Sequence, residues 1–292
     1  MDIYSLKSGI ECLSNCGIIL NTESYVLLRN SLVNLQNENH FKKTFLWGII
    51  FGIDEDYYIA YGYEKDALKG KIFYYSLDRI NWQLLPQPEP IHFVLTGICS
   101  NRFQGDPGLV TKIIDDSPVE ESDEEGNGNK DEGTIKQDLD VLKEEDRLAA
   151  TVCLIDEEVS IIPRGSLFLR EDGITIHSLA FEGIKSEEWD ELSNYQHYRV
   201  PHEKWNENIA SRQDYNYAVD FLDTIASDIP PDSWAAQLVD AGRTIVVKSL
   251  SWPGFIFYHT LETRDYGFIY SGTGQKNLDI PFMKTVVTDD TD

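Results

Sequence analysis

The chain has 292 residues, of which 41% are hydrophobic and 12% aromatic, and its formal net charge is −25. A chain of this length can bury a large core as one or two domains. The acidic balance argues against nucleic acid and against anionic membrane surfaces, both of which need clustered Lys and Arg, so we expect protein partners, including basic ones.

An N-terminal helical segment is expected over residues 1–40. Thr22 is a candidate helix cap. Four apolar residues follow it at helical spacing: Tyr25, Leu28, Leu32 and Leu35. Residues 3–13 predict a weaker helix that Gly17 would end. Helices of this length are marginal alone, so both are expected to dock on another element.

The β-rich first half of the core is expected over residues 41–113. Residues 45–63 hold two β-rich runs joined by an acidic turn at 54–56, which predicts a hairpin. Residues 71–86 repeat this design, so four short strands in a meander are expected. An extended linker with prolines at 86, 88 and 90 follows, and then an ordered loop over 102–108.

An acidic insertion separates the two halves, over residues 114–146. It carries fourteen Asp and Glu against three Lys, which accounts for eleven of the 25 net negative charges. The stretch ESDEEGNGNKDEG has no aromatic and no β-branched residue, so it cannot offset its own ordering entropy. We therefore expect 115–137 to be disordered.

The second half of the same core is expected over residues 147–283, followed by a tail over 284–292. Residues 148–168 predict a strand, an acidic turn and a second strand limited by Pro163. Another strand is expected over 174–180. Two helices are then predicted, one over 186–195 capped by Ser186 and one over 217–226 stopped by two prolines.

Two aromatic runs near the C-terminal end predict an antiparallel strand pair around a polar turn at 260–265. Phe255, Phe257 and His259 would face one side of a strand, and Ile256 and Tyr258 the other. Both faces are apolar or aromatic, which is typical of a strand covered on both sides.

Taken together, these patterns predict an α+β fold. N-terminal helices accompany a predominantly antiparallel sheet, built from both sides of an acidic, disordered insertion. The turn-linked strand pairs and the absence of a βαβ rhythm favour this class over a parallel sheet.

Reactive motifs are weak throughout the chain. The stretch SGTGQKN, 271–277, lacks the spacing of a phosphate-binding loop, so we interpret it as a turn that ends a strand. Cys12 and Cys16 have no second Cys or His pair beside them, which favours buried small apolar residues over a metal site. The acids at 54–56 lack a twelve-residue calcium loop and are interpreted as a solvated turn.

The six histidines include no HxH or HExxH pair. His197 and His202 are close in sequence, but Pro201 between them argues against a shared helix face. His259 alternates with Phe255 and Phe257 and is interpreted as a hydrogen-bonded core or interface histidine. We therefore assign no catalytic, cofactor-binding or metal-binding residue and expect no cofactor.

The four cysteines do not form a disulfide scaffold, and no signal-peptide pattern opens the chain. The longest apolar run, 45–53, has nine residues and is too short to span a bilayer. These features predict a cytosolic protein with reduced thiols.

A resemblance to a known family rests on four stretches: LWGIIFGIDEDYYIAYGY, FYYSLDRINWQLLP, IIPRGSLF and SLSWPGFIFYH. They resemble segments shared by the radial spoke head proteins of motile cilia and flagella. RFQGDPG and GTGQKNLDIPFM resemble one shorter branch of that family, because the longer paralogues, radial spoke head proteins 4 and 6, lack this ending. The similarity extends over 45–108 and 145–283 and does not cover the N-terminus, the insertion or the tail.

The resemblance implies a non-enzymatic subunit of the axonemal spoke head that passes mechanical signals from the central pair to the dynein arms. The implied partners are other radial spoke head proteins, the 4 and 6 paralogues in particular, and central-pair projections, within a hetero-oligomeric complex. Two alternatives stay open from the residues. One is an enzyme whose site assembles only in the fold, and the other is a free acidic adaptor.

Overall fold

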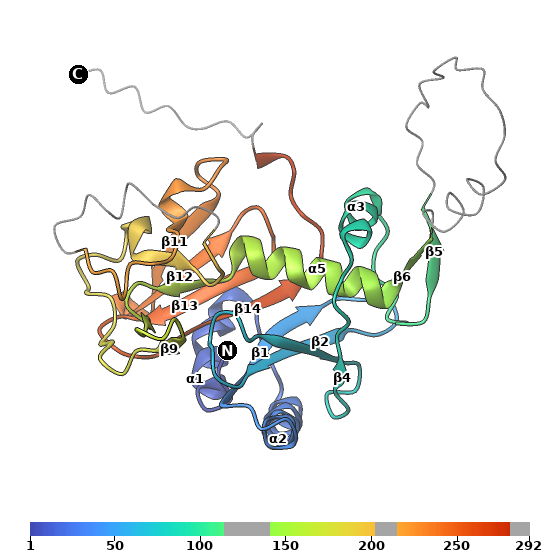
Figure 1. Ribbon diagram of the computed structural model, residues 1–292, viewed down its shortest axis with the longest axis horizontal. Coiled ribbons are helices and arrows are strands. Elements are labelled where there is room, and N and C mark those ends of the chain that lie inside the picture. The colour runs from blue at the N-terminus through green and yellow to red at the C-terminus, as the bar shows by residue number, and fades with distance from the viewer. Residues whose placement is uncertain (114–140, 202–214, 281–292) are drawn as a thin grey trace, which may run out of the picture.

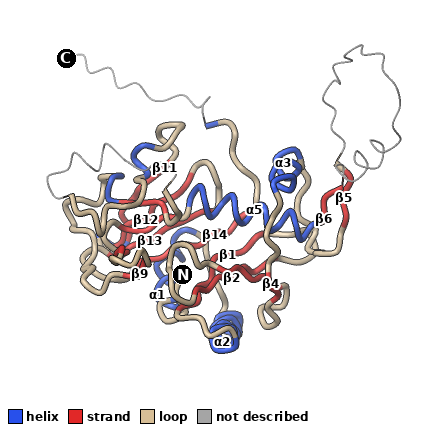
Figure 2. Tube along the Cα trace, viewed as in Figure 1, coloured by secondary structure: helices blue, strands red, loops and turns tan. Residues whose placement is uncertain are grey.

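The computed structural model describes residues 1–113, 141–201 and 215–280. They build one eight-stranded sheet with the strand order β11-β12-β13-β14-β1-β2-β3-β4 (Figures 1 and 2). The strands are β1 (Lys43–Ile50), β2 (Tyr57–Tyr63), β3 (Ile72–Ser76), β4 (Gln83–Leu84), β11 (Trp234–Val239), β12 (Thr244–Ser249), β13 (Phe255–Thr260) and β14 (Tyr266–Gly272). All neighbours are antiparallel except β1 and β14. Together with the helices, this confirms the predicted α+β class.

Helices and short strand pairs surround this sheet. The helices are α1 (Leu6–Leu13), α2 (Thr22–Glu38), α3 (Pro90–Ile98) and α5 (Glu144–Val159), with short 3₁₀ turns η1 (Ser14–Cys16), η2 (Leu192–Asn194), η3 (Ile225–Ser227) and η4 (Asp240–Gly242). The short strands are β5 (Val110–Lys112), β6 (Val141–Lys143), β7 (Ile161–Pro163), β8 (Leu167–Leu169), β9 (Thr175–His177) and β10 (Tyr195–His197). They pair as β5 with β6, β7 with β10 and β8 with β9.

The parallel pair β1–β14 joins strands from before the acidic insertion to strands from after it. Gly48 of β1 pairs with Tyr270 of β14, and a Cβ at position 48 would lie 2.2 Å from the Tyr270 carbonyl oxygen. The backbone of Met1 bridges the same two strands, because its nitrogen donates to the carbonyls of Leu46 (2.7 Å) and Phe268 (3.2 Å). The prediction that both sides of the insertion share one sheet is confirmed, although the junction itself is parallel.

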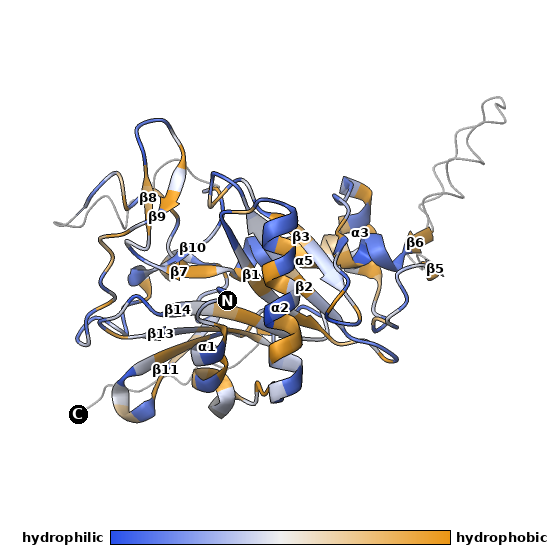
Figure 3. Cartoon of the chain, turned by 90° about the horizontal axis from the view of Figure 1, so that it is seen from below, coloured by the Kyte–Doolittle hydropathy of each residue, from blue (hydrophilic) through white to orange (hydrophobic). Residues whose placement is uncertain are grey.

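Each face of the sheet carries its own core. On one face, α5 packs on the aromatic side chains of β1, β2, β13 and β14. On the other face, α1 and α2 pack on smaller apolar side chains of the same strands. Figures 1 and 3 show α5 and the α1–α2 pair on opposite sides of the sheet. The aromatic hairpin alternates as predicted, since Phe255 and Phe257 belong to the first core and Ile256 and Tyr258 to the second.

The N-terminal helices and the first two hairpins are confirmed. In α2, however, the cap is Asn21 and not Thr22, because the Asn21 side chain accepts a hydrogen bond from the Ser24 amide at 2.7 Å. Gly17 ends the first helical segment with a φ of +87°. The meander β1–β2–β3–β4 has the predicted turns.

The predicted strand at the start of 148–168 is wrong, because these residues lie in α5. Leu148, Val152, Ile155 and Val159 follow helical spacing and are all buried. The helix is also buried around much of its circumference, with small residues such as Ala149 and Ala150 against its neighbours. Such a helix has little polar contrast, so its apolar run is difficult to distinguish from a strand. The later part of the prediction holds as the short strands β7 and β8.

The two helices predicted over 186–195 and 217–226 are also wrong. The first stretch consists of turns and η2, and the Ser186 hydroxyl donates to Glu262 at 2.7 Å in place of capping a helix. The second stretch is held by an ion pair, in which the Arg164 guanidinium contacts the Asp220 carboxylate at 2.7 Å. Polar tertiary contacts hold both segments in irregular conformations.

Two further predictions need revision, and one falls outside the described residues. The linker after Pro86 contains α3, which begins with Pro90 in the first turn, where proline is tolerated. The strand expected over 174–180 is shorter and spans only β9. The predicted disorder over 115–137 lies outside the described residues.

Candidate functional site

The Trp-Pro-Gly run sits where β12 turns into β13. Trp252 is 3% exposed, and its indole nitrogen donates to the Glu158 carboxylate of α5 at 2.7 Å. Gly254 has a φ of +108°, and a Cβ there would lie 2.4 Å from the Ser271 carbonyl oxygen. The run therefore fixes α5 to the sheet and lets two backbones approach closely.

The Gly-rich stretch 271–277 is a loop that ends β14, as predicted. Lys276, the residue that would contact phosphate in a nucleotide site, instead pairs with Glu158 at 2.8 Å. The amide of Gly274 donates to the Tyr270 hydroxyl at 2.9 Å, and a Cβ at this glycine would lie 2.8 Å from the Phe103 ring. The loop thus serves packing and has no free phosphate-binding lysine.

A buried carboxylate at the start of α5 holds the loop 102–108. Glu144 is 3% exposed and accepts hydrogen bonds from the Tyr57 hydroxyl (2.8 Å) and from the amides of Gln104 (3.0 Å) and Gly105 (2.8 Å). Burial and this contact raise the pKa of Tyr57 well above its usual range. The Glu144 side chain therefore connects the loop 102–108, strand β2 and helix α5.

A second buried carboxylate lies near the other end of α5. Asp156 accepts from the Trp47 indole at 3.1 Å and from the Ser160 hydroxyl at 2.7 Å. The Lys71 ammonium pairs with it at 2.7 Å, also donates to the Tyr198 carbonyl at 2.7 Å, and lies 3.9 Å from the Tyr198 ring centre. Burial lowers the pKa of Lys71, and Asp156 opposes that shift. This network connects β1, the start of β3, α5 and the segment after β10.

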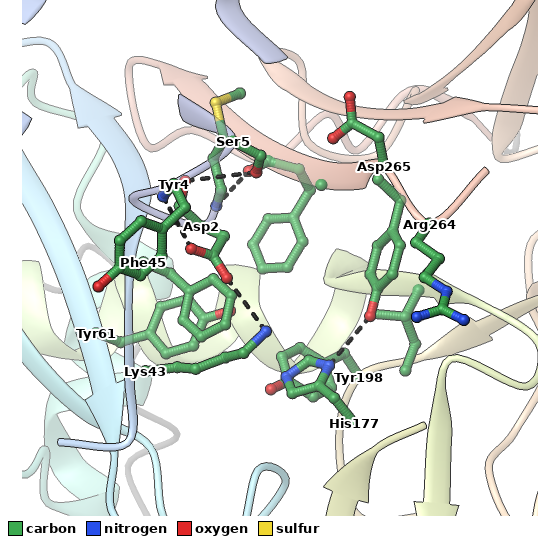
Figure 4. A pocket seen from close by; sticks show the side chains of 15 residues that line it. Asp2, Tyr4, Ser5, Lys43, Phe45, Tyr61, His177, Tyr198, Arg264 and Asp265 are labelled. Carbon is green, nitrogen blue, oxygen red and sulfur yellow. Dashed lines mark hydrogen bonds and ion pairs between the residues drawn. The ribbon is translucent and has the colours of Figure 1, made fainter. Parts of the chain in front are cut away.

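A cavity of about 320 Å³ opens beside the N-terminal residues, and Figure 4 shows its side chains. Aromatic rings form much of its wall: Phe45, Tyr61, Tyr198, Tyr266 and Phe268. An ion pair lies within it, since the Lys43 ammonium is 3.2 Å from the Asp2 carboxylate. The cavity thus combines aromatic walls with charged and titratable side chains, which a catalytic site would need.

His177 lines this cavity together with the carboxylates of Asp2 and Asp265. Its Nδ1 lies 3.1 Å from the Tyr266 hydroxyl. Desolvation lowers the pKa of His177 to about 3 and raises that of Tyr266 to about 12. The imidazole is therefore neutral and weakly basic, and the phenol keeps its proton near neutral pH. A general base for catalysis near pH 7 needs a pKa close to that pH, and a phenol nucleophile needs a lowered pKa, so neither group has the value that such catalysis requires.

The remaining histidines and cysteines considered in the sequence lie in ordinary core or surface environments. His259 is fully buried and hydrogen bonded on both ring nitrogens, by the Ile184 amide (3.0 Å) and to the Asp265 carbonyl (3.0 Å), which confirms the core-histidine prediction. Cys12 and Cys16 pack against the apolar core under α1 and α2, as expected of small apolar residues, but they are only half-buried. All four cysteines are free thiols, and His202 lies outside the described residues.

Within residues 1–113, 141–201 and 215–280, no three His, Cys, Asp or Glu side chains come together in a way that could hold a metal ion. None of the helices in the same ranges combines the length and the apolar character that crossing a bilayer requires. The acids at 54–56 form a turn in which the Asp56 carboxylate accepts from the Gly52 amide at 3.1 Å.

The two buried carboxylates were missed from the sequence. Both belong to α5, and their signal is visible only once 144–159 is treated as a helix. Glu144 and Asp156 then fall among the buried residues of that helix, where a charged side chain must be paired. The sequence patterns instead place Glu144 in the acidic insertion over 114–146 and Asp156 in a turn between two strands.

Comparison with known proteins gives one consistent result. A sequence model of the family described as "Radial spokehead-like protein" matches residues 2–148. The chain is 36% identical to the radial spoke head protein 9 homolog of Homo sapiens and 37% identical to that of Mus musculus, over 97% of this chain and 100% of each relative. The homolog of Danio rerio is 36% identical over the same shares.

Proposed function

The chain belongs to the radial spoke head family, and from that premise we propose that it is a structural, non-catalytic subunit of the spoke head in the ciliary axoneme. In this role it supports spoke assembly and helps relay mechanical signals from the central pair to the dynein arms. Its partners are other radial spoke head proteins, the 4 and 6 paralogues in particular, and central-pair projections. The observation that carries the proposal is similarity over 97% of the chain.

The interior of the protein supports a mechanical role. Two buried carboxylates, Glu144 and Asp156, tie α5 to the sheet and to two loops, and Trp252 adds a third connection. Buried, satisfied polar networks specify one arrangement of their elements and make it rigid. A subunit that transmits force benefits from such rigidity.

The enzyme alternative has little support from the described cavities. In the cavity around His177, desolvation shifts the pKa of this imidazole and that of the Tyr266 phenol away from the values that catalysis near neutral pH requires. Burial raises the pKa of the Cys153 thiol to about 11, so this thiol also stays protonated and weakly nucleophilic.

The proposal is tested by extracting axonemes of motile cilia with salt and asking whether the chain co-purifies with intact spokes. We expect it in the spoke fraction, in constant ratio to the other head proteins. A chain that stays in the soluble pool throughout would support the free acidic adaptor instead.

The variant Trp252→Ala provides a second arm of this test. Loss of a buried Trp costs about 3–5 kcal/mol of folding free energy, so we expect reduced incorporation and an incomplete spoke head. A folded, fully incorporated variant that had lost a small-molecule turnover would contradict the structural role.

A further inference from the structure

The two edges of the eight-stranded sheet differ in their protection. At one edge, β4 has two residues and is followed by prolines at 86, 88 and 90. At the other edge, β11 has six residues, WAAQLV, with neither a proline nor a charge. Figure 1 shows the two strands at opposite ends of the sheet. Short strands, prolines and charges are the usual means of preventing pairing at an edge, and β11 has none of them.

The register of β11 with β12 determines which of its backbone N–H and C=O groups point away from the sheet. The Leu250 amide donates to the Ser233 carbonyl at 2.9 Å, so these two residues form a hydrogen-bonded pair. Such pairs alternate along an antiparallel ladder. The backbones of Trp234, Ala236 and Leu238 therefore face outward. No backbone hydrogen bond joins these outward groups to any residue in 1–113, 141–201 or 215–280.

The side chains of β11 form the outermost row of the cores on both faces of the sheet, and an added strand would extend both cores. Trp234 and Ala236 pack on the α5 face, and Val239 packs on the α1–α2 face. Leu238 is 37% exposed at this boundary. A further strand would cover it and would receive three pairs of outward-facing backbone groups.

A cavity of about 450 Å³ lies at the Trp234 end of β11, against the C-terminal end of α5. Lys276 contacts Glu158 at 2.8 Å, and Arg199, which also lines the cavity, pairs with Asp223 at 2.8 Å. Asp228 accepts from the Trp234 indole at 2.7 Å and lies 2.8 Å from the Nε2 atom of His197. Glu157 also lines the cavity, is exposed, and forms no ion pair within the described part of the chain. Glu157 is thus a carboxylate of this cavity without an ion pair among the described residues, and it lies beside apolar wall residues such as Leu154.

We propose that β11 is a docking edge for an extended segment of another spoke protein, which adds a strand to the sheet and places a lysine or arginine beside Glu157. Main-chain hydrogen bonds to the outward groups of β11 hold the segment, and the cavity selects its basic side chain. The proposal rests on the proposed spoke function for the identity of the complex, and on the edge and the cavity for the mode of contact.

Charge favours a different chain over a second copy as the occupant. Two copies would each bring a net charge of −25, and their approach would be opposed by that repulsion. A segment with a basic residue meets the field of this chain and the charge of Glu157 favourably.

The test expresses the full chain in motile ciliated cells that lack their own copy. The variant Ala236→Pro removes an outward amide and leaves the bonds to β12 intact. Leu84→Pro is the matched control at the other edge, since the Leu85 amide donates to the Phe73 carbonyl at 3.0 Å and Leu84 therefore faces outward too. We expect Ala236→Pro to lower the axonemal fraction about tenfold and Leu84→Pro to leave it unchanged, with equal melting temperatures for both purified variants.

The charge is tested by Glu157→Lys, with Glu157→Gln as the milder change. We expect losses of about fivefold and twofold in axonemal fraction, because reversal repels the basic side chain and neutralisation only removes an attraction. Full incorporation of Ala236→Pro or of Glu157→Lys would overturn the proposal.

A photo-crosslinker in place of Gln237 identifies the occupant even if a proline variant fails to fold. The expected product joins this chain to a basic segment of another spoke protein. A crosslink to a second copy of the chain, or none within assembled spokes, would overturn the inference. If the unaltered chain is itself absent from axonemes, the proposed function fails, which is a separate outcome from a failure of the edge.

Discussion

The two faces of the central sheet are held by different kinds of interaction. The face covered by α1 and α2 buries mainly aliphatic side chains, such as Leu28 and Leu32 against Val246 and Ile269. The face covered by α5 buries aromatic rings and also two carboxylates, Glu144 and Asp156. Aliphatic burial stabilises in proportion to area and has no direction, whereas hydrogen bonds and ion pairs require particular geometry.

This difference gives the two faces different mechanical properties. Glu144 and Asp156 lie twelve residues apart on α5, which corresponds to about 18 Å along a helix. Contacts at both ends prevent the helix from sliding or rotating on the sheet. The α1–α2 pair lacks an equivalent pair of buried charges among its buried residues. We therefore expect the α5 face to respond to single substitutions as a unit and the other face to respond locally.

The largest loss is expected for Asp156→Ala on the α5 face. The Lys71 ammonium would be left buried without its counter-charge, and Trp47 and Ser160 would lose their acceptor. Breaking a buried ion pair on one side costs about 3–5 kcal/mol. Urea denaturation should show this loss in the free energy of unfolding.

A double variant separates charge from packing in this network. Lys71→Met combined with Asp156→Leu removes both charges, so it should be more stable than Asp156→Ala by about 1–3 kcal/mol. If the two are equally unstable, the loss comes from the Trp47 and Ser160 bonds and not from the unpaired ammonium.

A smaller loss is expected for Leu32→Ala on the aliphatic face. Leu32 is fully buried, and truncation of a buried Leu costs about 2–4 kcal/mol through lost burial and a residual cavity. Hydrogen exchange should show the effect confined to α1, α2 and the strands beneath them. Faster exchange in α5 of this variant would show that the two faces are coupled.

A pH-dependent loss is expected from His259. Its folded pKa is lowered to about 4 by burial, below the unfolded value near 6.5. As pH falls through this window the unfolded chain takes up a proton that the folded chain refuses, so stability is lost at up to about 1.4 kcal/mol per pH unit. Denaturant titrations between pH 7 and 5 measure this slope. His259→Gln should be less stable at pH 7 and should have a shallower slope.

The smallest effect is expected for deletion of residues 115–137. Strands β5 and β6 already pair on either side of the insertion, so a shortened loop connects the same ends. Halving a loop changes its closure entropy by only about 0.6 kcal/mol. A melting temperature lowered by many degrees would show that the insertion contributes to the core. The same deletion also removes the negative charge of these residues, so the stability of the two faces can be compared without that charge.

The predictability of the fold from the sequence follows the same division. The aliphatic helices and the aromatic hairpin have clear periodicity, because one side of α2 meets solvent and residues such as Phe257 and Tyr258 alternate between two cores. Helix α5 has no such contrast, since most of its circumference is buried, so 148–168 was wrongly predicted to begin as a strand.

The buried network could not be predicted, because its members come together only in the fold. Asp156 meets Lys71 from 85 residues away and Trp47 from 109 residues away. Such a carboxylate differs from a solvent-exposed one only by its place on the buried side of α5, which the strand prediction for this stretch concealed. The helix prediction for 186–195 was wrong for a related reason, since the hydrogen-bond partner of Ser186 is the distant Glu262.

The parallel junction between β1 and β14 has a consequence for biosynthesis. The pairing partner of Gly48 is Tyr270, which is synthesised about 220 residues later in the chain. At about 5–20 residues per second, a ribosome needs roughly 10–45 seconds to produce that partner. During this interval the nascent β1–β4 meander has an open β1 edge, which can pair with other unfinished chains. We therefore expect newly made copies to depend on chaperones until translation is almost complete.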